Sequence, residues 1–290
     1  MVSLEILINS LILGVMLGGL YAVIGLGLSL SFGVMKIVNL AHGDFLVLSC
    51  YLAYACLSFL GIDPIPSLIF LVPIFFVLGI ALQKFMLERS FKIDPNAPIL
   101  LTFGISIILQ NLYLLIWTPY SKALVTSYMM MSLKIGNYNI PFIYLLDLLV
   151  ALVVLILLRA FLKKTYLGIA IRASSQSWRA AQLVGINTSR VQAFAFGLAL
   201  ALSALSGVFV GLTLPFTPTS GVNYLLIAFG VLMIGGVGSM LGSFIGGIVM
   251  GLTQLISGMF LGVGWQLFFT SIIILIALSI RTEKILGVKK

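Results

Sequence analysis

Long apolar segments separated by short polar breaks run along the whole chain. A helix needs about 20 apolar residues to cross a bilayer, and most of these segments approach that length. The pattern therefore predicts an all-α polytopic membrane protein with eight or nine transmembrane helices, depending on whether the first polar break reaches the cytoplasm. The predicted segments are Ile6–Leu30, Leu40–Leu60, Ser67–Gln83, Ile99–Trp117, Pro141–Leu158, Val191–Leu214, Asn223–Ile234, Gly242–Phe260 and Trp265–Ile280.

Composition supports this class. Only 8% of the 290 residues are charged and 61% are hydrophobic, whereas soluble domains carry about 25% charged residues. The net charge of +9 follows from basic cytoplasmic loops and does not predict nucleic-acid binding. Cys50 and Cys56 lie on one apolar segment, a spacing that suits neither a disulfide nor a metal site. Since Met1–Glu5 has no basic region, we expect the first span to remain in the mature protein.

The segment from Arg159 to Arg190 is the longest one that cannot lie in a bilayer. It contains six cations and no acid, and each Lys or Arg at the bilayer centre costs about 2.5–3.5 kcal/mol. Its positive charge predicts a cytoplasmic location. Within it, the spacing of apolar residues predicts a short helix over Gln176–Gly185, capped by one of three nearby serines and followed by a turn over Asn187–Ser189. A cytoplasmic helix between two spans suits contact with a soluble partner.

Charge also predicts the orientation of the chain. The stretch Lys84–Asn96 is basic and is expected in the cytoplasm, as is the tail Arg281–Lys290. Pro119–Ile140 is expected outside, with a hairpin around Gly136-Asn137. With nine crossings the N-terminus faces out, Arg172 lies inside and Lys134 lies outside. No linker divides the chain, so residues 1–290 are expected to form one transmembrane domain that includes the cytoplasmic loop 159–190.

Two polar or glycine-rich stretches interrupt apolar segments, and they are the candidate transport pathway. The first is Lys36–Asp44, with the sequence KIVNLAHGD, and the second is Gly235–Gly247, with the sequence GGVGSMLGSFIGG. Paired broken helices near the bilayer midplane are typical of transport sites, and Asn39 could cap a half-helix there. The predicted pathway residues are Asn39, His42, Gly43, Asp44, Gly235, Gly236, Gly238 and Ser239.

Other interpretations of these stretches stay open. Lys36–Asp44 could be an interfacial turn with a structural His42, or His42 and Asp44 could relay protons. Small residues recur every four positions from Gly238 to Gly246 and from Ala199 to Gly211, which is typical of helix packing but also compatible with pore lining. The sequence has no P-loop and no HExxH or GxSxG motif, so no catalytic residue, metal site or nucleotide site is predicted.

Three blocks of residues resemble a known family. Asn39-Leu40-Ala41-His42-Gly43-Asp44-Phe45 is similar to the N-x-A-H-G-[DE]-F signature of LivH-type permeases of branched-chain amino acid ABC transporters. The basic segment resembles the family's coupling loop, and Gly235–Gly247 resembles its third block. The residues that match the coupling loop, and that the resemblance assigns to ATPase coupling, are Gly168, Arg172, Gln176, Ala180, Ala181 and Gly185. Two departures are Ser177, where an acidic or amide residue is expected, and Arg179, where an acid is expected.

The resemblance implies an ABC importer permease fold in a bacterial cytoplasmic (inner) membrane. It further implies a second, LivM-type permease, two ATP-binding subunits that hold ATP and Mg, and an extracytoplasmic solute-binding protein, with no cofactor bound by this chain itself. Branched-chain amino acids are the expected substrates, with urea, short amides and aromatic acids as alternatives within the same family. A self-powered channel or secondary transporter is the alternative outside it, and the cytoplasmic helix argues against that class.

Overall fold

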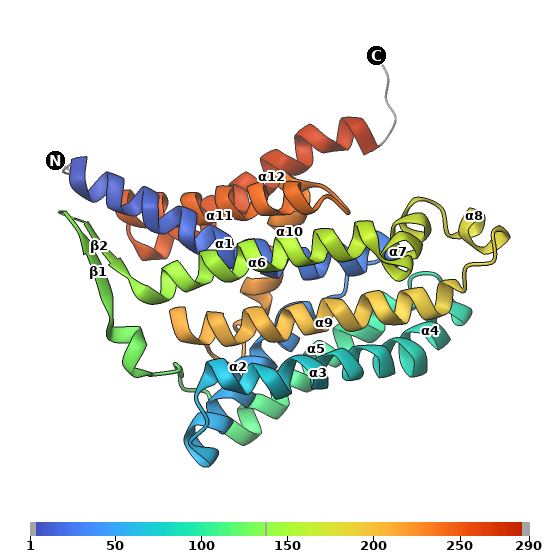
Figure 1. Cartoon of the computed structure of the whole chain (residues 1–290), viewed down its shortest axis with the longest axis horizontal. Helices are drawn as coiled ribbons and strands as arrows, with labels where there is room; N and C mark the ends of the chain where they lie inside the picture. Colours follow the sequence, from blue (N-terminus) through green and yellow to red (C-terminus); the bar gives the residue numbers. More distant parts are fainter. Residues whose placement is uncertain (1–3, 137, 286–290) are drawn as a thin grey trace.

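A computed structural model describes residues 4–136 and 138–285 as a helical bundle with one short hairpin (Figure 1). The helices are α1 (Leu4–Met35), α2 (His42–Leu60), α3 (Pro64–Leu82), α4 (Glu88–Ile93), α5 (Ala97–Trp117), α6 (Phe142–Lys164), α7 (Tyr166–Gln176), α8 (Trp178–Leu183), α9 (Thr188–Thr213), α10 (Gly221–Gly235), α11 (Met240–Leu261) and α12 (Gln266–Ile285). A π-helical turn η1 (Gln83–Leu87) joins α3 to α4, and short 3-10 turns η2 (Ser127–Met130) and η3 (Val263–Trp265) precede the hairpin and α12.

Each of the nine predicted apolar segments is helical, which confirms the fold class. Among the described residues, seven helices are long and apolar enough to cross a membrane, and α10 and the first part of α12 are shorter apolar helices. The basic stretch Lys84–Asn96 is largely helical, because η1 and α4 extend α3 without a break as far as Ile93.

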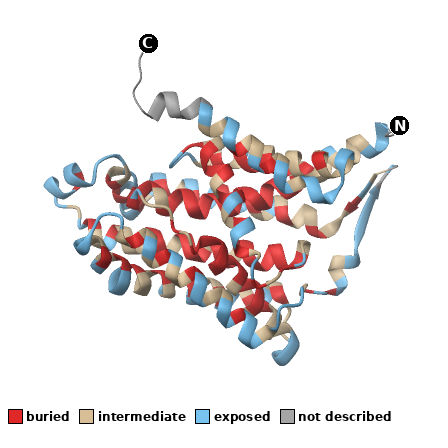
Figure 2. Ribbon diagram, turned by 180° about the vertical axis from the view of Figure 1, so that it is seen from behind, coloured by how far each residue is buried: buried red, intermediate tan, exposed pale blue. Residues whose placement is uncertain are grey.

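Helix α1 is the centre of the bundle. Most of its residues from Gly14 onward are buried, and it packs against α6, α9, α10 and α11. Its closest approach is to α11, where a Cβ at Gly18 would lie 2.5 Å from the Cα of Ile248. Small residues let helix backbones approach closely, and Gly14 and Gly18 serve this role because a Cβ at either would meet the α11 backbone. Buried residues gather in the middle of the bundle, whereas the outer helix faces are exposed (Figure 2).

The two ends of the bundle differ in the way that the charge pattern predicts. The start of α1 and the hairpin lie at one end, and α4, α7 and α8 lie at the other (Figure 1). The hairpin pairs β1 (Ser132–Ile135) with β2 (Tyr138–Pro141), which confirms the predicted hairpin, although Asn137 itself lies outside the described residues. Ser189 donates a 2.7 Å hydrogen bond to Glu88, so the two basic segments meet at the same end.

The segment predicted to be cytoplasmic contains one more helix than expected. The helix predicted over 176–185 is confirmed as α8, which Ser177 caps by accepting a hydrogen bond from Ala180 N. A further helix, α7, precedes it, and the two are separated at Ser177, which is extended. The expected turn at Asn187–Ser189 is wrong. Asn187 caps α9 by accepting from Arg190 N, and Thr188 already belongs to that helix.

Candidate functional site

The first interruption carries the chain back from the end of α1 into the middle of the bundle. Helix α1 ends at Met35, and the exposed Lys36 takes a left-handed conformation with φ of 59°. Residues 37–41 are non-helical, and His42 then opens α2 beside the carbonyl of Ile24. Ile24 lies about three turns, or about 16 Å, before the end of α1. The break is therefore deep in the bundle and is not an interfacial turn, although Lys36 itself is at the surface.

Asn39 stabilises this turn from within. Its Oδ1 accepts a 3.1 Å hydrogen bond from Ala41 N, and its carbonyl accepts from His42 N. The residue at the helix boundary is Ala41, which has no side-chain cap. Asn39 therefore caps the turn before α2 and does not cap the helix itself, which corrects the sequence prediction. Its Nδ2 is buried without a hydrogen-bond partner among the described residues.

His42 is fully buried between α1 and α9. Its Nε2 lies 3.1 Å from Ile24 O and its Nδ1 lies 3.3 Å from Ser203 Oγ. A carbonyl oxygen can only accept, so Nε2 carries a proton. The Ser203 hydroxyl also lies 3.1 Å from Ala199 O, and its single proton can be donated to that carbonyl or to Nδ1. Both ring nitrogens are placed by the fold.

Asp44 is held by a different helix. Ser106 Oγ and Gln110 Nε2 of α5 donate to its carboxylate at 2.5 and 3.1 Å, and Tyr113 Oη donates to its backbone carbonyl at 2.8 Å. His42 faces α1 and α9, whereas Asp44 faces α5. The two side chains thus have separate partners, an arrangement that gives no direct hydrogen-bonded route for a proton between them.

The starts of α2 and α10 meet at this depth. A Cβ at Gly43 would overlap the carbonyl oxygen of Gly221, and a Cβ at Gly221 would overlap the Asp44 carboxylate. The neighbouring helix α9 extends about 15 Å from Ser203, opposite His42, to its end at Thr213. Residues 214–220 must therefore return inward before α10 begins. Two helices start inside the bundle, each after a non-helical segment.

The second interruption is shorter than predicted. Only residues 236–239 are non-helical, and Ser239 caps α11 by accepting from Gly242 N. Gly242 packs on Gly235, and Gly247 packs on α1 at Gly18, so these glycines serve helix packing. The two interruptions still lie near one another. Gly238 N donates to Ser29 Oγ at 3.1 Å, about 7.5 Å along α1 from Ile24.

The structure thus brings Asn39, His42, Gly43 and Asp44 together in the bundle core, with Gly235, Gly236, Gly238 and Ser239 further along α1. Sequence reasoning missed the partners of the first group. Ser106, Gln110 and Tyr113 recur on α5 at spacings of four and three, and this polar stripe in an apolar helix is the signal that could have identified them.

The second group of predicted residues lies at the basic end. Arg172, Gln176, Ala180 and Gly185 are exposed, whereas Gly168 and Ala181 are buried. Gly168 sits in the corner between α6 and α7, where a Cβ would overlap Phe161 O, and Ala181 packs inward with 3% exposure. Neither can contact a partner directly in this conformation. They shape the segment that carries the exposed residues.

Helix α8 ends in a Schellman motif. Ile186 N donates to Ala181 O and Gly185 N donates to Gln182 O, and Gly185 has φ of 83°. This pattern satisfies the last carbonyls of a helix and requires a left-handed residue, usually glycine. It confirms that Gly185 ends the helix. The tip presents three large apolar side chains, Trp178, Leu183 and Val184, of which Leu183 is 89% exposed.

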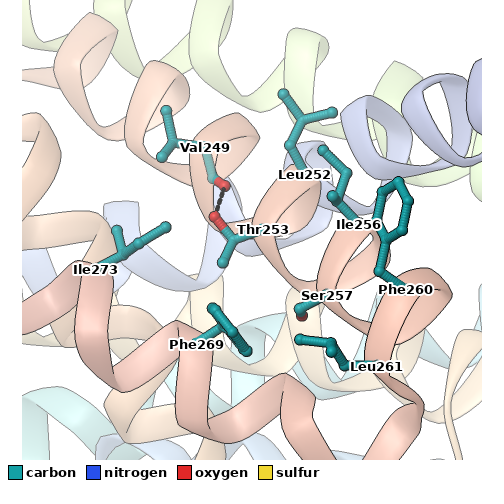
Figure 3. Close-up of a pocket in the computed structure, with 9 residues that line it drawn as sticks. All are labelled: Val249, Leu252, Thr253, Ile256, Ser257, Phe260, Leu261, Phe269 and Ile273. Atoms are coloured by element: carbon teal, nitrogen blue, oxygen red, sulfur yellow. Dashed lines mark hydrogen bonds between the residues drawn. The ribbon is translucent and has the colours of Figure 1, made fainter.

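An apolar groove lies between α11 and α12 (Figure 3). It has a volume of about 440 Å³ and is lined by Val249, Leu252, Thr253, Ile256, Ser257, Phe260, Leu261, Phe269 and Ile273. Its two hydroxyls are satisfied within α11, since Thr253 donates to Val249 O and Ser257 donates to Gln254 O. The groove offers no polar group to a ligand, so it suits lipid chains or another helix better than a polar substrate.

The described residues offer no cluster of three or more His, Cys, Asp or Glu side chains that could hold a metal ion. Cys50 and Cys56 are both free thiols, and Cys50 Sγ lies 3.0 Å from Gly207 O. What the site offers is buried hydrogen-bonding groups and broken helices, which can gate or line a route.

Comparison with known proteins identifies one family. Residues 10–278 match the model described as the permease component of branched-chain amino acid transport systems. The chain is 27% identical over 287 residues to the high-affinity branched-chain amino acid transport permease LivH of Salmonella typhimurium, covering 94% of this chain and 93% of the relative. It is 24% identical over 261 residues to BraD of Pseudomonas aeruginosa, covering 85% of each chain. The probable permease LivH of Methanocaldococcus jannaschii is 27% identical over 81% of this chain and 76% of its own length. No solved structure matches the chain significantly.

Proposed function

Because the chain belongs to the family of permease components of branched-chain amino acid transport systems, we propose that it is the membrane subunit of an ATP-driven importer for these amino acids. The observation that supports this most strongly is the family match along 10–278, together with an exposed helical element at the basic end of the bundle. The chain itself is a transport permease, and ATP and Mg would bind to separate partner subunits.

The element that would receive force from an ATPase is the α7–α8 segment. It projects from the bundle and exposes Arg172, Gln176 and the apolar tip around Leu183. An exposed apolar cluster rimmed by polar residues is typical of a protein contact site. The departure at Ser177 leaves capping intact, because that serine accepts from Ala180 N. Arg179 stacks on Trp178 at 5.3 Å, which adds positive charge to the contact surface.

The route for the substrate would pass the broken helices. Non-helical backbone at membrane depth is tolerated where protein or a water-filled cavity surrounds it, and here α2 and α10 both begin in the bundle core. Asn39, His42, Gly43 and Asp44 would move with that junction when access alternates, and Gly235, Gly236, Gly238 and Ser239 would act as a hinge between α10 and α11. In the described conformation His42 and Asp44 are fully packed, as expected for a closed state.

The assembly that follows has a second, LivM-type permease, two ATP-binding subunits and an extracytoplasmic solute-binding protein. The N-terminus and hairpin end would face the binding protein outside a bacterial inner membrane, and the C-terminus would be cytoplasmic. The exposed apolar faces of α3, α5 and α6 would contact lipid or the second permease.

Uptake in a deletion strain tests this function. Cells that lack the chain should lose ATP-dependent uptake of labelled leucine, isoleucine and valine, and the wild-type gene should restore it. A Leu183→Asp variant should insert normally but fail to co-purify the ATP-binding subunits, while Thr165→Ser, a conservative change in the same segment, should retain them. Normal leucine uptake without the chain would contradict the proposal, and loss of only urea, amide or aromatic-acid uptake would reassign the substrate.

A further inference from the structure

An acidic residue that the sequence analysis did not single out lies inside the bundle. Asp147 is in the second turn of α6 and is 1% exposed. Thr213 Oγ1 donates to its Oδ2 at 2.9 Å, but its Oδ1 is buried with no hydrogen-bond partner among the described residues. Ionisable residues within membrane spans are costly, and they commonly mark ion or substrate sites. The free Oδ1 therefore calls for a hydrogen-bond partner that the described residues do not provide.

The surroundings of Asp147 are polar but uncharged. Tyr21 of α1 and Tyr144 of α6 lie within electrostatic reach of the carboxylate, and Tyr224 of α10 lies close to Tyr21. Tyr21 Oη donates to Gln254 Oε1 of α11. Five helices thus contribute hydroxyl or amide groups to one region: α1, α6, α9, α10 and α11. No cation is among these groups, and the basic residues of α6 begin at Arg159, about 18 Å further along the helix.

This polar region connects to the hairpin end of the bundle. Gln254 Nε2 lies 3.5 Å from Gln266 Oε1, which is half-buried at the start of α12. Tyr144 is also half-buried near the start of α6. A track of polar side chains therefore leads from the end where the binding protein would deliver substrate to the unpaired carboxylate oxygen.

We propose that Asp147 binds the ammonium group of the amino acid as it enters the permease. This inference rests on the proposed function and names a recognition residue for it. An ammonium group donates charge-assisted hydrogen bonds to a carboxylate. Such a site favours amino acids over molecules of the same shape that lack the ammonium group, because those leave the buried carboxylate without a counter-charge.

The test compares leucine with 2-hydroxy-4-methylpentanoate, which replaces the ammonium group by a hydroxyl. Binding of each is measured on the purified permease–ATPase complex without the solute-binding protein, so that the permease alone discriminates. The wild-type complex should prefer leucine by at least about tenfold. Asp147→Asn should bring this ratio close to one, because the amide keeps the Thr213 hydrogen bond but removes the charge. Loss of a merely structural contact would weaken both ligands equally.

Asp63→Asn is the matched control. Asp63 caps α3 and contacts Tyr128 at the same end of the bundle, and Asn also caps helices well, so this variant should keep the wild-type ratio. An unchanged ratio in Asp147→Asn, or a wild-type complex that does not prefer leucine, would overturn the inference. If one of these outcomes is found while the wild-type complex still imports leucine with its binding protein, only the proposed role of Asp147 is refuted. Absence of wild-type import would refute the proposed function itself.

Discussion

Close backbone contact at Gly43 is the most demanding feature at the scale of single residues. Its Cα lies against the Gly221 carbonyl where α2 and α10 begin, and neither backbone can retreat without moving a helix. The sequence motif around His42 predicted that this region lies on the transport pathway. It could not show that the contact is between two half-helices, because Gly221 follows a Pro/Thr/Ser stretch that looks like an ordinary surface turn.

Gly43→Ala should reduce uptake, and Gly43→Leu should abolish it. A Cβ here overlaps Gly221 O, and overpacking of a tight contact costs about 1–3 kcal/mol. The measurement is leucine uptake normalised to the amount of assembled complex. Gly104→Ala on α5 is the control, since a Cβ there meets nothing within 4 Å. Wild-type uptake by Gly43→Leu would show that this junction does not take part in transport.

Substitutions at His42 distinguish a packing role of this residue from a role in proton transfer. Its Nε2–H donates to Ile24 O, and its Nδ1 lies 3.3 Å from the Ser203 hydroxyl. A glutamine amide can donate and accept in the same place, so His42→Gln should keep much of the uptake. His42→Ala should impair it, because losing a buried hydrogen-bond partner costs about 1–3 kcal/mol. The thermal stability of the complex should fall in the His42→Ala variant and should change little in the His42→Gln variant. An inactive Gln variant in a normal amount of complex would instead support a proton relay.

At the scale of elements, apolar length and charge predicted the spans well because the bilayer restricts backbone to helices. Element ends were less predictable. The basic segment 159–190 forms the predicted helix as α8, but the sequence did not predict α7, which ends where Ser177 becomes extended. Gly185 was identified correctly because a helix that ends in a left-handed residue has a strong sequence signal.

Gly185→Trp should uncouple transport from ATP hydrolysis. The position is exposed, with nothing within 4 Å of a Cβ, so a large side chain projects toward a partner, and φ of 83° adds strain of about 1–2 kcal/mol. Gly185→Asn is the control, since asparagine tolerates this conformation. ATPase rate with and without loaded binding protein is the measurement. A charged residue in place of Ala181 should have a different effect. Because Ala181 is buried, such a variant should destabilise α8 itself. Normal uptake by Gly185→Trp would mean that the tip faces no partner.

At the scale of the whole molecule, the hairpin and α8 lie at opposite ends of the bundle (Figure 1), and the charge pattern predicts that these ends lie on opposite sides of the membrane. The sequence did not reveal the buried cluster around Asp147, whose members come from five helices and meet only through tertiary packing. A single acid in an apolar helix was the available signal.

Cysteine labelling tests the orientation. In a background with Cys50 and Cys56 replaced by serine, Lys134→Cys should react with an impermeant thiol reagent in intact cells. Arg172→Cys should react only after the membrane is permeabilised, because a basic segment remains in the cytoplasm. Uptake by both variants shows that the fold is retained. Reaction at 172 in intact cells would reverse the assigned sides.

The most direct measurement is leucine uptake into proteoliposomes that contain this chain, its partner permease and both ATP-binding subunits, with the solute-binding protein on the substrate side. The account predicts accumulation of leucine that requires both ATP in the ATPase compartment and the binding protein, and that disappears when this chain carries Gly43→Leu. Leucine uptake that proceeds equally well without ATP would contradict it and would identify a channel or a secondary transporter.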